Sequence, residues 1–228
     1  MLTSPQGVSI FMMTNNIASC PSSPKKLKTV KNMPDFSTPF NHFTQWFEEA
    51  KKQPTIKDPN AVNVATVSPE GKPASRMVLL KDYDENGFVF YTNLGSRKAQ
   101  HLHNNPHAAM CFYWEILRKQ IRIEGSISPV SEEEADAYFH SRALKSRIGA
   151  WASKQSQPLD SRATLLKEVA KQTARFALQD VPRPEFWSGF RLTPDYFEFW
   201  QNGEYRIHDR TCYQKNTDGT WGNHLLYP

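Results

Sequence analysis

The spacing of apolar residues changes along this chain, and each spacing predicts a type of element. Between residues 40 and 52, aromatic side chains recur at helical intervals, which predicts an amphipathic helix that ends before Pro54. From 61 to 67, apolar and polar positions alternate instead, as in a strand with one buried face. The pattern therefore predicts a helix followed by the first strand.

The later apolar segments are short and are separated by turn residues, such as Asn86-Gly87, which supplies the positive φ that a hairpin needs. Further strands are predicted at 76–81, 88–93, 108–114, 120–128, 188–192, 196–201, 206–214 and 221–226. Helices are predicted to begin at an N-cap Ser96, at a capping box that starts with Ser131, and over 162–178. Hairpin-linked strands with interspersed helices predict a mainly β fold, an antiparallel Greek-key-like barrel with helices packed outside.

Composition divides the chain into two parts. Residues 1–34 contain no Asp or Glu and are rich in Ser, Thr, Asn, Pro and Lys, which predicts a disordered tail, with organelle targeting as the alternative. Residues 35–228 suit one domain. Three cysteines without metal-ligand spacing favour a reducing, cytoplasmic location and no metal site, with a mitochondrial location as the alternative. No apolar run is long enough to span a membrane.

The formal net charge is +5 and the pI is about 9.0, which suits an anionic ligand. The charge is dispersed, so nucleic-acid binding is the weaker interpretation. Arg76 and Lys81 lie at the two ends of a predicted apolar strand, where folding gives no reason for a cation. Arg97 and Lys98 fall in the first turn of a helix, whose amino end already favours anions. These positions predict a phosphate site, and the alternative is a solvated basic turn.

Two other groups of polar residues have a spacing that places them together. Tyr138, Arg142 and Ser146 would share one face of a continuous helix and offer donors to a phosphate, although an ordinary polar helix face is the alternative.

In the last third of the chain, Arg206, His208 and Arg210 alternate. They would therefore point to one face of a strand, where they would repel one another unless a ligand covered them.

Several segments in register resemble the pyridoxine (pyridoxamine) 5′-phosphate oxidase family from about residue 35 to the end of the chain. They are RMVLLK at 76–81, YTNLGSRKA at 91–99, YFHSR at 138–142, IGAWASKQS at 148–156, EFWQ at 198–201 and RIHDR at 206–210.

The resemblance implies a split-barrel FMN-binding fold and a homodimer that holds FMN between its subunits. It implies oxidation of pyridoxine 5′-phosphate or pyridoxamine 5′-phosphate to pyridoxal 5′-phosphate, with oxygen as acceptor giving hydrogen peroxide, and ammonia from the amine. Carried over by position, the FMN set is Arg76, Met77, Val78, Leu79, Tyr91, Thr92, Arg97, Lys98, Gln120, Gln155, Ser156, Trp200 and Arg210. The substrate set is Lys81, Tyr138, Arg142 and Ser146 around the phosphate, with Arg206 and His208 as catalytic residues against the pyridine ring and the reacting carbon.

Three positions depart from the family pattern. A basic lid segment, an Arg followed shortly by a Tyr, is not recognisable before Phe40; Leu225 stands where an Arg is usual, and Ala143 where a Pro is usual. A split-barrel flavin reductase, or a non-catalytic protein that binds FMN or pyridoxal phosphate, therefore remains an alternative. A flavin reductase would not need the Tyr138, Arg142 and Ser146 set, and the missing lid segment would allow a non-catalytic protein.

Overall fold

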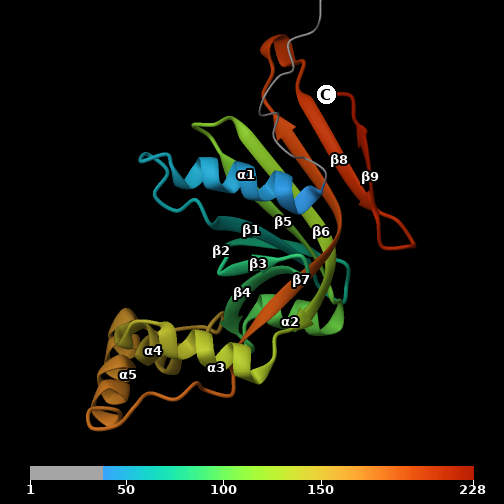
Figure 1. Cartoon of the computed structure of the whole chain (residues 1–228). Coiled ribbons are helices and arrows are strands. Elements are labelled where there is room, and N and C mark those ends of the chain that lie inside the picture. Colours follow the sequence, from blue (N-terminus) through green and yellow to red (C-terminus); the bar gives the residue numbers. More distant parts are fainter. Residues whose placement is uncertain (1–37) are drawn as a thin grey trace, which may run out of the picture. The chain divides into compact units, whose positions relative to one another are not determined.

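A curled antiparallel sheet of nine strands forms the centre of the computed structural model, which describes residues 38–228 (Figure 1). All of these residues belong to one compact unit, Pro34–Pro228. The predicted tail, 1–34, and the expected place of the lid motif lie outside the described residues.

Strand bounds follow the predicted alternation closely. The strands are β1 (Ala61–Val67), β2 (Pro73–Leu79), β3 (Asp82–Asp84), β4 (Gly87–Asn93), β5 (His107–Trp114), β6 (Lys119–Pro129), β7 (Trp187–Gln201), β8 (Asp209–Lys215) and β9 (Trp221–Leu225). Their order is β2-β1-β5-β6-β7-β4-β3, and β8 and β9 continue from the second half of β7. The amide of Lys81, just after β2, donates to Val89 O in β4 at 2.9 Å, so the sheet curls back on itself as a barrel does. The predicted mainly β fold is confirmed.

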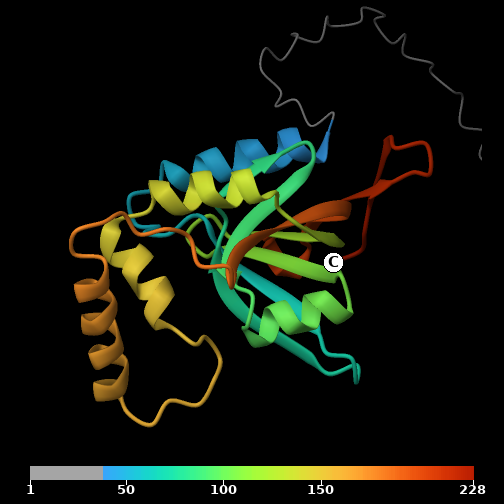
Figure 2. The same cartoon turned by 90° about the horizontal axis from the view of Figure 1, so that it is seen from below.

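Helices pack outside this sheet. They are α1 (Pro39–Lys51), α2 (Arg97–Asn104), α3 (Glu132–Ser141), α4 (Leu144–Ala152) and α5 (Arg162–Arg175). The apolar stripe of α1 closes the barrel core, where Phe43 packs edge-on against Phe88 and Phe112 with no exposed surface. Helices α3, α4 and α5 gather at the end of the sheet that lies away from β8 and β9 (Figures 1 and 2). One end of the sheet is therefore covered by helices, and the other is extended by β8 and β9.

Several predicted elements differ from the structure. Strands 188–192 and 196–201 are one continuous strand, β7, with an irregular register opposite Glu124 and Gly125 in β6. A Cβ on Gly125 would lie 2.1 Å from Thr193 O, so the glycine permits the close approach there. The helix predicted to reach residue 178 ends at Arg175. In the turn before β4 only Gly87 has a positive φ, and Asp84 Oδ1 accepts from the amides of Asn86 and Gly87.

None of the helices in residues 38–228 is both long enough and apolar enough to cross a membrane.

Candidate functional site

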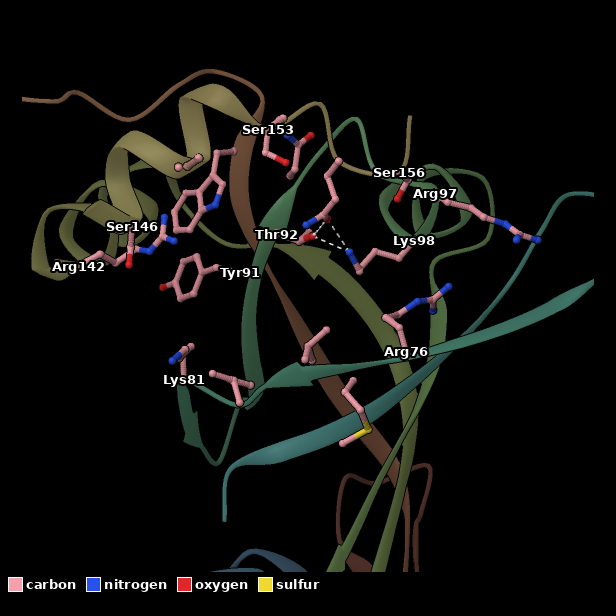
Figure 3. A pocket seen from close by; sticks show the side chains of 18 of the residues that line it. Arg76, Lys81, Tyr91, Thr92, Arg97, Lys98, Arg142, Ser146, Ser153 and Ser156 are labelled. Carbon is pink, nitrogen blue, oxygen red and sulfur yellow. Dashed lines mark hydrogen bonds between the residues drawn. The ribbon is translucent and has the colours of Figure 1, made fainter. Parts of the chain in front are cut away.

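A cavity of about 850 Å³ lies where β2 and β4 meet α2 on one side and α3 and α4 on the other (Figure 3). Five cations line it, and no Asp or Glu of the described chain does. None of the five forms a salt bridge with a described carboxylate, whereas most other arginines of this part of the chain have one. The cations are Arg76, Lys81, Arg97, Lys98 and Arg142. The cavity therefore carries a positive charge that its own walls do not neutralise.

The cations form two separate groups (Figure 3). The first, which we call the Lys98 cluster, contains Arg76, Arg97 and Lys98. Ser96 caps α2 by accepting from Ala99 N, so the sequence Ser96-Arg97-Lys98 places two cations at the amino end of a helix as predicted.

Hydrogen bonds fix the lysine of this cluster. Lys98 Nζ donates to Thr92 Oγ1 at 3.0 Å and to Gln155 Oε1 at 2.8 Å. Arg76 Nη1 donates to Val64 O and Thr66 Oγ1 at 2.9 and 2.8 Å, which holds its side chain against β1. Lys98 and Arg76 are thus held in place by neutral oxygens.

Electrostatics show that these cations are not compensated. Burial, together with the charge of Arg76, lowers the pKa of Lys98 to about 8. Burial and the charge of Arg97 lower the pKa of Arg76 as well. Each shift means that the charged form is less favourable here than in water, and an anion in the cavity would reverse that effect. Such shifts are typical of a ligand site rather than of a surface ion pair.

The second group, the Arg142 cluster, contains Lys81, Tyr138, Arg142 and Ser146. The Arg142 guanidinium lies 4.7 Å from the centroid of the Trp187 ring, and burial lowers its pKa. Its Nη1 atom is buried and has no hydrogen-bond partner within residues 38–228. A buried charged donor left unpaired is costly, so this atom indicates a place for an acceptor atom of a ligand.

Tyr138, Arg142 and Ser146 were predicted to share one face of a continuous helix, and the continuous helix is wrong. Helix α3 ends at Ser141, and Arg142 is extended, with ψ of 149°. Helix α4 starts at Leu144, and its N-cap, Ala143, makes no side-chain capping bond. The three side chains still line the same cavity, Tyr138 from α3, Arg142 from the break between the helices and Ser146 from α4.

Most of the predicted site residues line the cavity, and five do not. Those that do are Arg76, Met77, Val78, Leu79, Lys81, Tyr91, Thr92, Arg97, Lys98, Tyr138, Arg142, Ser146, Gln155 and Ser156. Those that do not are Gln120, Trp200, Arg206, His208 and Arg210.

The predicted residues that do not line the cavity lie in another part of the fold. Gln120 of β6, Trp200 of β7 and Arg210 of β8 stand directly opposite one another in the register, so they share one face of the sheet. This group lies at the end of the sheet away from α3 and α4 (Figure 1). Within one chain, the predicted site residues therefore form two separate groups.

The prediction that Arg206, His208 and Arg210 alternate along one strand is wrong, because β8 begins at Asp209. Arg206 ends a short 3₁₀ turn, Glu204–Arg206, in which Tyr205 and Arg206 both have a positive φ, of 53° and 65°. Two consecutive non-glycine residues in this region are strained, which is common where a loop presents functional groups.

The same loop fixes the orientation of His208. The amide of Gly203 donates to His208 Nδ1 at 3.2 Å, and the imidazole lies 4.8 Å from the Trp200 ring. Nδ1 is therefore an acceptor, so neutral His208 carries its proton on Nε2 and presents a donor there.

Sequence reasoning did not include Trp187, which lines the cavity and is 6% exposed. Its ring stacks on Tyr91 at 5.3 Å, and Tyr91 stacks on Tyr138 at 4.0 Å. Burial and nearby Glu134 raise the pKa of Tyr91 to about 12. A single tryptophan at the start of a strand gives no sequence signal for this role.

Comparison with known proteins agrees with this geometry. A family model described as "Pyridoxamine 5'-phosphate oxidase" matches residues 48–175, and one described as "Pyridoxine 5'-phosphate oxidase C-terminal dimerisation region" matches residues 187–228. A pyridoxine/pyridoxamine 5′-phosphate oxidase of Brucella abortus (strain 2308) is 50% identical over 206 residues, covering 89% of this chain and 99% of the relative. The protein of the same name from Brucella canis is 53% identical over 191 residues, covering 83% and 94%.

Solved structures show the same fold. PhzG from Burkholderia lata 383, in complex with tetrahydrophenazine-1-carboxylic acid, is 30% identical with a TM-score of 0.79, covering 84% of this chain and 93% of that one. A pyridoxamine 5′-phosphate oxidase-related, FMN-binding protein from Nostoc punctiforme, 18% identical with a TM-score of 0.69, covers 84% and 98% and supports the fold alone. With both family models matched in order and close relatives aligned over most of its length, the chain belongs to the pyridoxamine 5′-phosphate oxidase family.

Proposed function

We propose that this protein is an FMN-dependent oxidase that converts pyridoxine 5′-phosphate or pyridoxamine 5′-phosphate to pyridoxal 5′-phosphate with oxygen as acceptor. The observation that carries the proposal is the cavity with two separate cation clusters and no acidic wall residue within the described chain. Two clusters suit two phosphorylated ligands, and the names of the relatives support the same pair of activities.

In this proposal the Lys98 cluster binds the FMN phosphate. Its charges meet at the amino end of α2, where the amides and the helix dipole also favour an anion. Thr92, Gln155 and Ser156 add donors or acceptors beside it, and Met77 to Leu79 of β2 lie along the same wall. Bound FMN would supply the acceptor for two electrons, while the protein supplies binding and orientation.

The Arg142 cluster binds the phosphate of the substrate. The unpartnered Nη1 of Arg142 would gain an acceptor, and Lys81, Tyr138 and Ser146 would add a charge and two hydroxyls. This phosphate does not react, so the cluster holds the substrate equally in the ground state and the transition state.

The second half of the site comes from another subunit of a homodimer. The match to a dimerisation region supports this, and so does the separation of Trp200 and Arg210 from the cavity. Arg206 and His208 would then orient the pyridine ring, with His208 donating from Nε2. We assign neither residue as an obligatory base. A cytoplasmic location remains a prediction from composition alone.

One structural neighbour supports an alternative, in which the substrate is a carboxylic acid without a phosphate. PhzG was solved in complex with tetrahydrophenazine-1-carboxylic acid, a ligand without a phosphate group. The Arg142 cluster, with a second cation at Lys81, favours a phosphorylated substrate here. A flavin reductase would not need the Arg142 cluster to bind a substrate phosphate.

The visible spectrum tests the proposal. The purified protein should be yellow, and pyridoxine 5′-phosphate added without oxygen should bleach the flavin band, because electrons then have no other acceptor. Admitting oxygen should restore the colour and release hydrogen peroxide. A colourless protein that FMN does not reconstitute would refute the proposal. Bleaching by a nicotinamide donor but not by the phosphorylated vitamer would identify a reductase.

FMN binding should depend on pH through Lys98. The pKa of this amine is about 8 without a ligand, and a neighbouring phosphate must raise it, so binding takes up a proton above that pH. The Kd for FMN should therefore rise above about pH 8, by up to about tenfold per pH unit. Titration of the apoprotein by flavin fluorescence measures this.

Lys98→Met is the matched control, since methionine keeps the length of the side chain and cannot titrate. It should bind FMN more weakly at every pH, with a flat profile. A wild-type Kd that stays constant across this range would show that Lys98 does not face the bound phosphate.

A further inference from the structure

Glu198 is a buried carboxylate that the function above does not use. It lies near the end of β7 and is 2% exposed. Its neighbours Phe197 and Phe199 point into the core, where Phe40 and His42 of α1 pack on them, so Glu198 points to the opposite face of the sheet. That face also carries Trp200, two positions along the strand. A buried carboxylate there needs compensation by charged partners.

Two arginines provide that compensation from either side. Arg210 donates its Nε to Glu198 Oε1 at 2.8 Å, and its Nη2 lies 2.8 Å from the same oxygen. Arg122 donates its Nη1 to Oε2 at 2.8 Å. Arg122 also pairs with Glu124, so Arg122 has a second carboxylate and Arg210 does not. The orientation of Arg210 thus depends on Glu198 more than that of Arg122 does.

The end of the chain holds Arg210 from its other side. Arg210 Nη1 donates to Tyr227 O at 2.8 Å, and the amide of Leu226 donates to Arg210 O at 3.0 Å. Of the five N–H groups of this guanidinium, one on each terminal nitrogen stays available. Arg210 is therefore held in one orientation, with its charge compensated and two donors left.

This environment is the reverse of that in the Lys98 cluster. There, cations stand without a carboxylate and suit a phosphate. The charge of Arg210 is neutralised by the adjacent carboxylate, so what it presents to a ligand is two oriented N–H donors and little net charge. Such donors suit neutral acceptors such as ring carbonyl oxygens or ring nitrogens.

From this geometry we infer that Glu198 and the Tyr227 carbonyl position Arg210, so that its two remaining N–H groups meet a neutral, acceptor-rich part of the flavin in the site of the other subunit. Glu198 is thus a positioning residue that acts through Arg210. The inference rests on the proposed function, because it takes FMN as the ligand.

A double-mutant cycle on FMN binding tests it, with the full-length chain stripped of flavin and titrated with FMN. Arg210→Ala should raise the Kd about tenfold or more, and Glu198→Gln by a similar factor. The double variant should be no weaker than Arg210→Ala alone, because Glu198 acts only through that arginine. Deleting residues 227 and 228 should raise the Kd by roughly three-fold, through the same arginine.

Arg122→Met is the matched control, since it removes the other charged partner of Glu198 without touching Arg210. It should lower the urea midpoint of unfolding as Glu198→Gln does, yet leave the FMN Kd within about two-fold. This comparison separates a positioning role from general damage to the sheet.

The outcomes are distinct. Additive effects of Glu198→Gln and Arg210→Ala would overturn the inference, as would a Glu198→Gln chain with wild-type FMN affinity and lowered stability. A wild-type chain that binds FMN while Arg210→Ala has no effect would also overturn it, and would leave the oxidase proposal standing. A wild-type chain that binds no FMN would instead refute the proposed function.

Discussion

Replacing Arg142 by leucine should raise the KM for pyridoxine 5′-phosphate by roughly 30- to 150-fold and leave kcat within about two-fold. The guanidinium has a buried nitrogen without a partner, which a phosphate oxygen would satisfy. Loss of such a charge-assisted contact costs about 2–3 kcal/mol. Because the phosphate does not react, the loss falls on binding and not on the chemical step. Steady-state oxygen uptake at several substrate concentrations measures both constants, and stopped-flow bleaching of the flavin isolates the chemical step.

Arg147→Leu is a matched control on the neighbouring helix α4. Arg147 is paired with Asp180 and does not line the cavity, so its loss should leave the KM unchanged. Both variants should retain FMN. If Arg142→Leu slows bleaching at saturating substrate, the guanidinium acts on the chemical step and its assignment to the phosphate is wrong.

At pyridoxine 5′-phosphate concentrations far below the raised KM of Arg142→Leu, two impaired variants should restore activity to each other when their chains are mixed. Arg142→Leu damages the cavity half of the site, and His208→Asn damages the half that lies on the loop before β8. In a mixed dimer one site receives both damaged halves and the other receives two intact halves. Chains mixed in equal amounts, unfolded and refolded together, should therefore recover about a quarter of the wild-type activity.

The kinetic constants of the recovered activity are the sharper readout. The intact site should have the wild-type KM, not the raised value of Arg142→Leu. Each variant refolded alone is the control and should stay at its own low activity. If the mixture shows only the mean of the two variants, each site is built from one chain and the shared-site proposal fails.

The fold was predictable because its strands alternate regularly and its helices begin with capping residues. Thr38, Ser96 and Ser131 each accept a hydrogen bond from the amide three residues ahead. The continuity of β7 was not predictable, because Pro194 normally ends a strand. It is tolerated here at the irregular register beside Gly125, where the sheet bends.

The candidate site was predictable only where a local pattern fixes it. Arg97 and Lys98 follow a helix cap, so their place is set by neighbouring residues. The loop before β8 was misjudged, since the positive φ of Tyr205 and Arg206 has no signature in these residue types. Gly203 is required there because a Cβ would lie 1.7 Å from Ile207 O, a contact that only the folded loop reveals.

The role of Glu198 depends on arginines from two other strands, Arg122 of β6 and Arg210 of β8, and on the contact of Arg210 with Tyr227 O. The alternation of residues along β7 places Glu198 on one face of the sheet but does not indicate that its side chain is buried. Only the assembled sheet shows that a carboxylate stands between Arg122 and Arg210.

The uncompensated Lys98 cluster also bears on the lifetime of the protein in the cell. Its cations repel one another until an anion lies between them, so the proposed binding of FMN would stabilise the folded chain. Newly made chains in excess of the available flavin should unfold more often and be degraded by proteases first. Supply of the cofactor would then set the abundance of the protein by selective degradation, without any regulator of synthesis.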